Sequence, residues 1–171
     1  MKQDRNEDLY RLVLVGTERM TTMSVKQISV FLENRTGGLV DFTQVLYENN
    51  IDIRAFSIAE APDFGIARVI VDDFEKAKDT LKHAGYVISV TPVLAVAIPD
   101  RAGGLYEVLT HFDEAGVNVR YTYAFTGREK GMTNRVFCVT EEEKAVEVLN
   151  KYQIQVIHQE DLHCNDGTLC L

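Results

Sequence analysis

Between residues 26 and 90 the chain alternates between two kinds of hydrophobic pattern. Ile28, Val30 and Leu32 stand two positions apart, which predicts a strand. After a pair of glycines, apolar residues fall at positions 39, 42, 45 and 46, the spacing of a helix with one buried face. The same rules predict strands over 51–58, 67–71 and 87–90, and a helix from 74 that Gly85 ends. The predicted order is β-α-β-β-α-β.

A second stretch, from about residue 92 to 158, repeats this order. Leu105, Val108, Leu109 and Phe112 form the apolar stripe of its first helix. The other predicted elements are strands over 93–98, 117–125, 134–140 and 154–157, and a helix marked by positions 145, 146 and 149. Split β-α-β order of this kind gives a four-stranded antiparallel sheet with both helices on one face. The predicted fold class is α+β, with two ferredoxin-like βαββαβ domains.

The two stretches are also related in sequence. The hexapeptide at 34–39 returns 66 positions later at 100–105, and Ile51–Arg54 returns at the same shift as Val117–Arg120. Farther on, 68–70 aligns with 135–137, so the shift has grown to 67. A unit of this length exceeds a solenoid repeat and is large enough to bury a core of its own. The pattern indicates a duplicated small domain.

These patterns divide the chain into an N-terminal extension over 1–25, domains over 26–91 and 92–160, and a tail over 161–171. Pro92 has no backbone N–H to donate to a strand ladder, so we place the break between the domains there. The absence of a flexible linker favours a rigid pair. We interpret the extension either as an extra helix or strand on the core or, preferably, as a disordered lead.

Composition narrows the class of protein. The chain has 171 residues, 46% of them hydrophobic, and a formal net charge of −8. That charge argues against a nucleic-acid binder, which needs clustered Lys and Arg. The sequence has no run of 18 apolar residues and no pattern of a secretory signal, so we expect a cytoplasmic protein without a membrane span. Of its three cysteines, Cys138 lies in an apolar run and is expected to be a buried thiol.

Metal and catalytic motifs are weak. The tail contains His163, Cys164 and Cys170, with His158 upstream, but no pair of them has a zinc-ligand spacing, so a frayed tail is preferred over a metal site. The remaining histidines, His83 and His111, lie in predicted helices. The sequence contains no recognisable triad, phosphate loop or dinucleotide fingerprint. We therefore predict a protein that is not an enzyme and uses no metal or cofactor.

The repeated turn after each first strand carries the strongest chemical signal. An Asn or Asp is followed by Arg, a small residue and two glycines, directly before a helix. Glycine allows close approach of a ligand to the backbone, and a helix N-terminus favours a carboxylate. The alternative is structural: Asn34 and Asp100 cap their helices, and the glycines only permit the turn. The sequence leaves both interpretations open.

In both copies the turn resembles that of ACT domains, the small regulatory βαββαβ modules of amino-acid metabolism. The resemblance rests on 33–39 and 99–105, and on the step after the first helix, Asn50-Ile51-Asp52-Ile53 and Gly116-Val117-Asn118-Val119. It covers about residues 26–90 and 92–158. The family's usual proline is replaced by Thr36 in one copy and Ala102 in the other, which should loosen the turn slightly without removing a ligand contact.

The resemblance implies an amino-acid ligand held where two ACT domains meet, as in phosphoglycerate dehydrogenase. Its amino and carboxylate groups would be held by Asn34 and Asp52 in copy one, and by Asp100 and Asn118 in copy two. The complete set of implied ligand-binding residues is Asn34, Arg35, Thr36, Gly37, Gly38, Leu39, Asp52, Ile53, Asp100, Arg101, Ala102, Gly103, Gly104, Leu105, Asn118 and Val119.

Two further features bear on these sites. Arg54 and Arg120 share strand parity with Asp52 and Asn118, so either could reach a carboxylate, although a solvated charge beside an acidic residue is the preferred interpretation. The copies also differ where a strand could line the ligand's side chain, with Ala-Phe-Ser at 55–57 against Tyr-Thr-Tyr at 121–123. The two sites are therefore not expected to be equivalent.

The sequence thus predicts an amino-acid-binding regulatory or sensor protein that signals through oligomerisation, as a homodimer, or through contact with a partner enzyme. One alternative is a regulatory subunit of an amino-acid biosynthetic enzyme. Another, of a different class, is a small ferredoxin-like enzyme that uses the glycine turns for an anionic substrate.

Overall fold

The computed structural model describes residues 23–60, 64–127 and 129–162. The expectations for the first 22 residues and for His163, Cys164 and Cys170 lie outside these described residues. The first domain contains β1 (Val25–Glu33), α2 (Gly38–Glu48), β2 (Ile53–Glu60), β3 (Phe64–Val71), α3 (Phe74–His83) and the first half of β4 (Ile88–Pro99). The second contains the rest of β4, α4 (Gly104–Glu114), β5 (Val119–Phe125), β6 (Met132–Val139), α5 (Glu142–Lys151), β7 (Gln155–Ile157) and the short 3-10 helix η1 (Gln159–Leu162).

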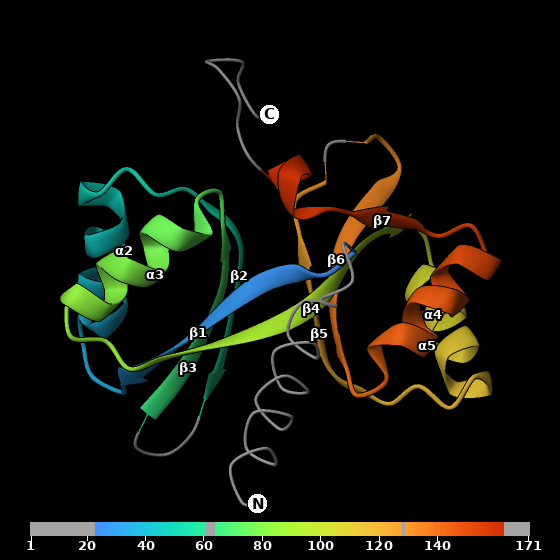
Figure 1. Ribbon diagram of the computed structural model, residues 1–171, viewed down its shortest axis with the longest axis horizontal. Coiled ribbons are helices and arrows are strands. Elements are labelled where there is room, and N and C mark those ends of the chain that lie inside the picture. Colours follow the sequence, from blue (N-terminus) through green and yellow to red (C-terminus); the bar gives the residue numbers. More distant parts are fainter. Residues whose placement is uncertain (1–22, 61–63, 128, 163–171) are drawn as a thin grey trace, which may run out of the picture.

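Each domain has the predicted architecture. In the first, the strand order is β2-β3-β1-β4, and in the second it is β5-β6-β4-β7, with antiparallel pairing throughout. Phe42 and Leu46 of α2 and Leu81 of α3 pack with Ile28 and Val30 in one core, so both helices cover the same face. The second domain repeats this arrangement. Helices α2 to α5 therefore lie on the two outer flanks of the described part of the chain, with the strands between them (Figure 1). The α+β prediction is confirmed.

Pro92 does not interrupt a strand, because β4 runs without a break through this residue. Pro92 stands opposite Lys26, whose backbone N–H donates to the Gln159 side chain at 2.9 Å, so this pair lacks a ladder hydrogen bond on that side. On its other side, β4 pairs with β6 only from Leu94 onward. Pro92 thus stands where β4 exchanges one neighbour for another and its missing donor costs nothing. One strand belongs to both domains.

The register also corrects the predicted alignment of Arg68 with Arg135. Val69 pairs with Ile28, and Phe137 pairs with Leu94, which stands 66 positions after Ile28. The structural equivalent of Val69 in the second domain is therefore Phe137, and not Val136 as the sequence alignment implied. The true shift is 68, and Arg68 and Arg135 lie on opposite faces of their sheets because side chains alternate along a strand.

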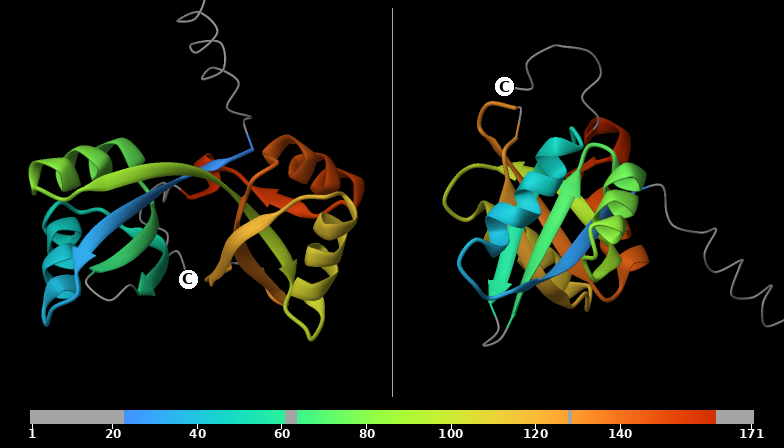
Figure 2. Two further views of the ribbon diagram at one scale, coloured as in Figure 1. Left: turned by 90° about the horizontal axis from the view of Figure 1, so that it is seen from below. Right: turned by 90° about the vertical axis from the view of Figure 1, so that its left-hand side faces the viewer.

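The helix-free faces of the two sheets pack against each other in a third core. Ala55 and Ile70 from the first domain meet Tyr123, Val136 and Cys138 from the second. Cys138 is buried, as predicted. Leu162 of η1 belongs to this core and is only 4% exposed, so the chain stays packed one residue beyond the expected start of the tail. Figure 2 shows the two sheets on either side of this region, joined by β1 and β4. The shared strand and this core together give the expected rigid pair a structural basis.

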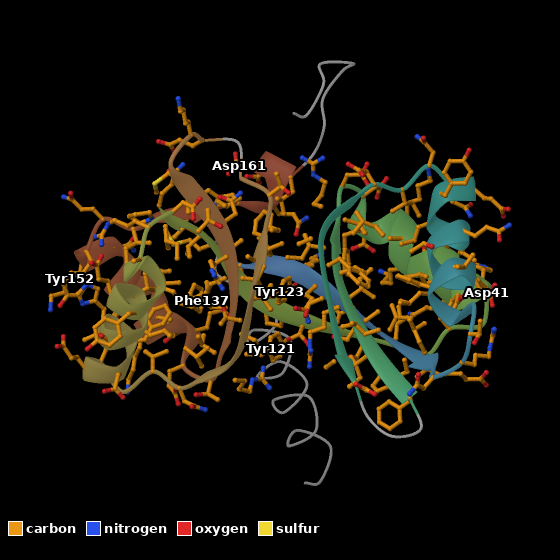
Figure 3. All side chains as sticks on the ribbon, turned by 180° about the vertical axis from the view of Figure 1, so that it is seen from behind. Asp41, Tyr121, Tyr123, Phe137, Tyr152 and Asp161 are labelled. Carbon is orange, nitrogen blue, oxygen red and sulfur yellow. The ribbon has the colours of Figure 1, made fainter. Side chains whose placement is uncertain are left out.

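A polar cluster is buried within this third core. Gln27 of β1 has no exposed surface. Its amide nitrogen donates to the Tyr121 hydroxyl at 2.8 Å and to Ser29 at 3.2 Å, while its carbonyl accepts from the Tyr123 hydroxyl at 2.9 Å. The Arg68 guanidinium lies 4.1 Å from the centre of the Tyr121 ring. Both tyrosines project between the sheets (Figure 3). The cluster links the first strand of one domain to β5 of the other.

Burial makes the stability of this core sensitive to alkaline pH. Desolvation raises the pKa of Tyr123 above its ordinary value of 10.0, so the folded state retains the phenolic proton that the unfolded chain loses. Because this pKa is higher in the folded state, the contribution of the protonated Tyr123 to stability is fully present below pH 10 and is lost as the pH rises. We expect urea midpoints to decline between pH 10 and 12, and to decline less steeply in Tyr123→Phe. Equal slopes in the two proteins would contradict this.

Candidate functional site

The two repeated turns have the same construction. Gly37 and Gly103 precede α2 and α4 with φ of 85° and 90°, a left-handed conformation that side chains other than glycine rarely adopt. The next residue approaches backbone closely: a Cβ added at Gly104 would lie 2.3 Å from the Pro99 carbonyl oxygen, and at Gly38 it would lie 3.0 Å from that of Glu33. The turn itself therefore accounts for both glycine pairs, most strictly at Gly104 and less strictly at Gly38.

The turn arginines fold back onto their own helices. Arg35 donates to Asp41 at 2.6 Å and to Glu33 at 3.2 Å, and the hydrogen bond to Asp41 is the main reason that its pKa is raised. Arg101 donates to both carboxylate oxygens of Glu107 at 2.8 Å. Each guanidinium is thus engaged by an acidic group in or next to the first helical turn. Both guanidinium groups are held against the turn, although more than half of each arginine side chain remains exposed.

The capping alternative for Asn34 and Asp100 is wrong. The N-cap residues are Gly37 and Gly103, and neither helix receives a side-chain capping hydrogen bond. The side chains of Asn34 and Asp100 lie exposed at the surface beside Thr36 and Ala102, which are also exposed. The local structure of the turn therefore gives no role to the side chains of Asn34 and Asp100.

The backbone donors expected from the glycine pairs are only partly available. The N–H groups of Gly38 and Gly104 donate to the carbonyls of Arg35 and Arg101, both at 3.1 Å. Donors of the first helical turn, such as the N–H groups of Leu39 and Leu105, have no acceptor within a helix and remain the candidates for an anion.

The strand positions predicted to complete each site are built alike. The N–H of Asp52 donates to Asp72 at 2.9 Å, and that of Asn118 donates to Glu141 at 3.0 Å. Glu141 also accepts from the Thr140 hydroxyl, and this bond is the main cause of its lowered pKa. The backbone donors here are consequently occupied, and only the exposed side chains of Asp52 and Asn118 can contact a ligand. The next residues, Ile53 and Val119, pack against the helix-side cores.

The structure places the two halves of each predicted site at opposite ends of a sheet. Ile53 pairs with Val71, and Val69 pairs with Ile28, so Ile53 is level with Lys26. Asn34 follows Lys26 by eight positions, about 26 Å at roughly 3.3 Å per residue. In the second domain Asp100 and Asn118 are separated in the same way, because Val119 pairs with Val139 and Phe137 with Leu94. One domain alone cannot hold a small ligand with both residues.

The differing strand segments serve the packing of the two domains. Tyr121 and Tyr123 bond to Gln27 across the third core, so neither is free to line a ligand's side chain as the sequence suggested. The charged neighbours differ as well. Arg54 donates to Asp52 at 2.8 Å, whereas Arg120 donates to the Cys138 sulfur at 2.8 Å. The preferred interpretation, a solvated charge beside an acidic residue, is only partly right for Arg54, which lies beside Asp52 but whose side chain is only 15% exposed.

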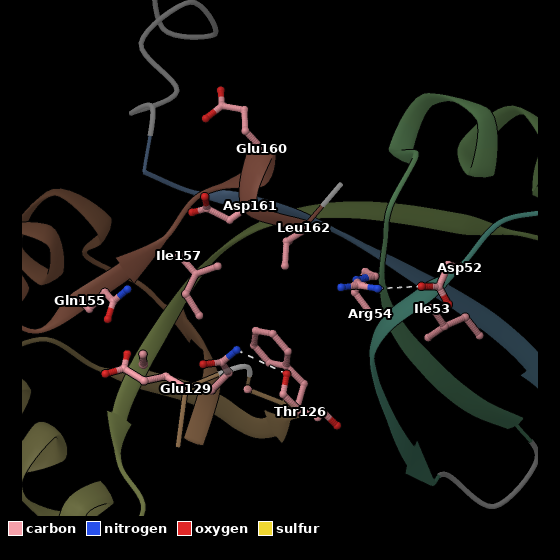
Figure 4. Close-up of a pocket in the computed structure, with 14 residues that line it drawn as sticks. Asp52, Ile53, Arg54, Thr126, Glu129, Gln155, Ile157, Glu160, Asp161 and Leu162 are labelled. Atoms are coloured by element: carbon pink, nitrogen blue, oxygen red, sulfur yellow. Dashed lines mark hydrogen bonds and ion pairs between the residues drawn. The ribbon is translucent and has the colours of Figure 1, made fainter. Parts of the chain in front are cut away.

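A cleft of about 630 Å³ opens between the domains at one end of the third core. Asp52, Ile53 and Arg54 at the start of β2 form one wall. The other wall belongs to the second domain, with residues from the ends of β4, β5 and β7, the 126–134 hairpin and η1. Figure 4 shows Arg54 extending from its strand toward Leu162 and the second domain. Of the predicted site residues, only Asp52 and Ile53 line the cleft.

Sequence reasoning missed Gln27 and the cleft residues of the second domain. Gln27 aligns with Val93 in the other copy and therefore carries no repeat signal. The hairpin that contributes Thr126, Gly127 and Glu129 is where the copies differ in length, which is the one signal that could have drawn attention to it.

Two consecutive βαββαβ units with matching glycine turns define a tandem of small ferredoxin-like domains. The chain belongs to the family described as the ACT domain pair, which matches residues 23–165. No curated protein matches the sequence.

Solved structures agree with this assignment. A protein from Bacteroides thetaiotaomicron is 36% identical, with 84% of this chain and 98% of that one covered and a TM-score of 0.78. The regulatory subunit of aspartate kinase from Thermus thermophilus is 14% identical, with 75% and 92% covered and a TM-score of 0.57. That from Thermus flavus is 15% identical over the same shares, with a TM-score of 0.56. The two aspartate kinase subunits share the fold of this chain.

Two further properties can be stated for the described part of the chain. None of its helices combines the length and the apolar character that crossing a bilayer requires. Its His, Cys, Asp and Glu residues form no group of three or more that could hold a metal ion.

Proposed function

We propose that this protein is a regulatory ACT pair that binds a small amino acid or related metabolite where ACT domains of two chains meet. The observation that carries the proposal is the repeated turn. Its arginine and glycines are accounted for by local structure, while Asn34 and Asp100 remain exposed and cap nothing. A carboxylate can accept from the ligand's ammonium group, and an amide can serve either end.

The separation of the two halves supports a site between chains. Asn34 and Asp52 lie about 26 Å apart in their own sheet, far beyond the reach of one amino acid. A turn must therefore meet the strand end of a different ACT domain. The helix-free faces are already packed within the chain, so a homodimer would supply the missing half from its second copy. The ligand would then favour the dimer whose interface it completes, which is a shift of population.

Thermal shift measurements on the full chain against the twenty amino acids test this proposal. One or a few should raise the unfolding midpoint, because a ligand at 100 times its dissociation constant stabilises by about 2.7 kcal/mol. The double variant Asp100→Ala/Asn118→Ala should lose the response of the second site. Glu114→Ala, an exposed carboxylate on the same helix as the turn, is the matched control and should respond as the original does. A clean unfolding curve that no amino acid moves would reject the proposal.

A second candidate is a regulatory subunit that acts by binding a biosynthetic enzyme. Its support is the arrangement of the Thermus thermophilus relative, of which this chain spans 92% and which is described as a regulatory subunit of aspartate kinase. Affinity purification of the full chain from its own cells distinguishes the two. Recovery of an enzyme in fixed stoichiometry would favour the subunit, and a lone dimer would favour autonomous sensing.

A further inference from the structure

A groove of about 610 Å³ lies between the two helices of the first domain. Val45 and Glu48 line it from α2, and Asp79, His83 and Ala84 line it from α3 and its C-terminal end. None of the residues proposed to hold an amino acid is among its described lining residues, and it shares no lining residue with the cleft between the domains. The groove is therefore a separate surface on the outer flank of the first domain.

The second domain fills the corresponding space with its own side chains. Helices α2 and α4 begin at residues 38 and 104, a shift of 66, and α3 and α5 begin at 74 and 142, a shift of 68. At these shifts His111 stands in place of Val45, and Tyr152 in place of Ala84. The two rings stack, with 3.5 Å between their centres and 9° between their planes. Figure 3 shows Tyr152 at the outer flank of the second domain. The second domain thus shows what a groove of this construction holds.

The rim of the groove is alike in both copies. The Lys151 ammonium lies 5.0 Å from the centre of the Tyr152 ring. Its counterpart His83 is held beside the open groove, because its Nδ1 lies 2.7 Å from the Asp79 carbonyl oxygen. Three further rim positions keep the sign of their charge, and these pairs are Glu48 and Glu114, Lys76 and Lys144, and Asp79 and Glu147. The first domain therefore provides the surroundings of an aromatic ring but not the ring.

An exposed tyrosine stands beside this groove. Tyr47 of α2 is 82% exposed, more than any other large apolar side chain in the described residues. Successive residues of a helix lie about 100° apart, so Tyr47 is level with Val45 and Glu48 but points to the other side of α2. It cannot enter the groove of its own chain. In the second domain, where the groove is filled, the counterpart of Tyr47 is Asp113. The open groove and the exposed ring thus occur in the same domain.

We propose that the first domain self-associates through α2 and α3, with Tyr47 of each chain seated in the groove of a second copy. A twofold axis parallel to α2 exchanges the two sides of this helix, so each ring reaches the other groove at its own level, as a self-complementary interface requires. This contact goes beyond the proposed amino-acid sites and needs no ligand.

The charges of the helices favour this contact in the first domain. There, α2 carries two carboxylates and no cation, whereas α3 carries three lysines and two carboxylates. The twofold axis places α2 of each copy against α3 of the other, so opposite charges meet. In the second domain α4 carries three carboxylates without a lysine or arginine, and α5 carries three carboxylates against two lysines. The same contact between second domains would be repulsive.

Sedimentation equilibrium of the full chain without any amino acid measures the association. We expect a reversible dimer that Tyr47→Ala weakens at least tenfold, because buried tyrosines are frequent anchors of interfaces. Tyr106→Ala is the matched control, since it removes a tyrosine that is 73% exposed on the corresponding helix of the second domain, and the dimer should be unchanged. A chain that stays monomeric at every concentration would overturn the proposal, as would an equal loss in Tyr106→Ala.

Filling the groove is the second test. Val45→His with Ala84→Tyr rebuilds in the first domain the stack of the second. Ala84 and Tyr152 are the C-caps of their helices with similar backbone angles, φ −74° and −95° and ψ 0° and 9°, so a tyrosine fits at position 84. We expect the filled variant to keep its unfolding midpoint and to dimerise at least tenfold more weakly. A dimer that survives both Tyr47→Ala and the filled groove would overturn the assignment of this surface.

A further variant separates this contact from the proposed ligand sites. Asp100→Ala/Asn118→Ala should leave the ligand-free dimer intact even where it abolishes the response to an amino acid. Tyr47→Ala should leave the thermal shift produced by an amino acid in place. Loss of the ligand-free dimer in Asp100→Ala/Asn118→Ala would place the contact at the turns and overturn the helix interface.

Discussion

Replacing Gly104 with alanine is expected to destabilise the second domain by about 3 kcal/mol or more, at or above the upper end of the usual cost of overpacking. The added Cβ would lie 2.3 Å from the carbonyl oxygen of Pro99, closer than any real contact of this kind. Both partners belong to the backbone, so no side chain can move aside. The end of β4 or the start of α4 must shift, and with it the turn that presents Asp100.

The other copy supplies the control. In Gly38→Ala the added Cβ would lie 3.0 Å from the Glu33 carbonyl oxygen, a contact that a few tenths of an ångström relieve. Alanine is favoured over glycine within a helix by about 1 kcal/mol, which offsets much of that cost. We therefore expect Gly38→Ala to change stability by about 1 kcal/mol or less. Urea unfolding followed by circular dichroism measures both variants. A loss in Gly104→Ala no larger than in Gly38→Ala would show that the turns are not built as described.

Gln27→Leu is expected to destabilise the chain by about 2–4 kcal/mol. Leucine is close to glutamine in volume but provides no hydrogen bonds, so the hydroxyls of Tyr121 and Tyr123 lose their shared partner inside the third core. An unsatisfied buried polar group costs about 1–3 kcal/mol. Tyr121 is less buried than Tyr123, so we expect the combined cost of the two unsatisfied hydroxyls to stay below twice the maximum for one buried group. Chemical denaturation gives the size of the effect.

Removing all three polar groups separates hydrogen bonding from shape. In Gln27→Leu/Tyr121→Phe/Tyr123→Phe neither unpaired hydroxyl remains, so we expect the triple variant to recover much of the stability lost in Gln27→Leu. Residues that share a hydrogen-bond network show coupling of about 0.5–3 kcal/mol, and the cycle measures it. Strictly additive losses would mean that Gln27 contributes through packing alone.

The fold of each domain could be predicted because its signals are local. Period-two and helical spacing identify which residues of an element face a core, and the glycine pairs identify where each first helix begins. The candidate turns followed from the same signals, and the structure keeps Asn34 and Asp100 exposed there. The strand halves proposed for the sites could be named from the sequence, but their position in space could not. Nothing in the spacing of Asn34 and Asp52 reveals that parallel strands put them at opposite ends of a sheet.

The errors have a common physical origin. Pro92 was expected to end a strand because it lacks a donor, but whether a donor is needed depends on the neighbour at that point, which is a long-range property. Arg68 and Arg135 were matched by resemblance, while a change of one residue in register moves a side chain to the other face. Tyr121 and Tyr123 were considered as possible lining of a ligand's side chain because the sequence does not show that Gln27, 94 and 96 positions away, lies against them.

The sequence by itself determined two βαββαβ domains, the helices that cover one face of each sheet, and the two glycine turns. These follow from interactions between residues close together in the chain. Only the tertiary structure decided that β4 is shared, that the helix-free faces meet in a third core, and that a cleft opens between the domains at its end. Hydrophobic periodicity indicates which face of a helix or strand must be buried. Which surface packs against that face depends on contacts between segments that are far apart in the sequence.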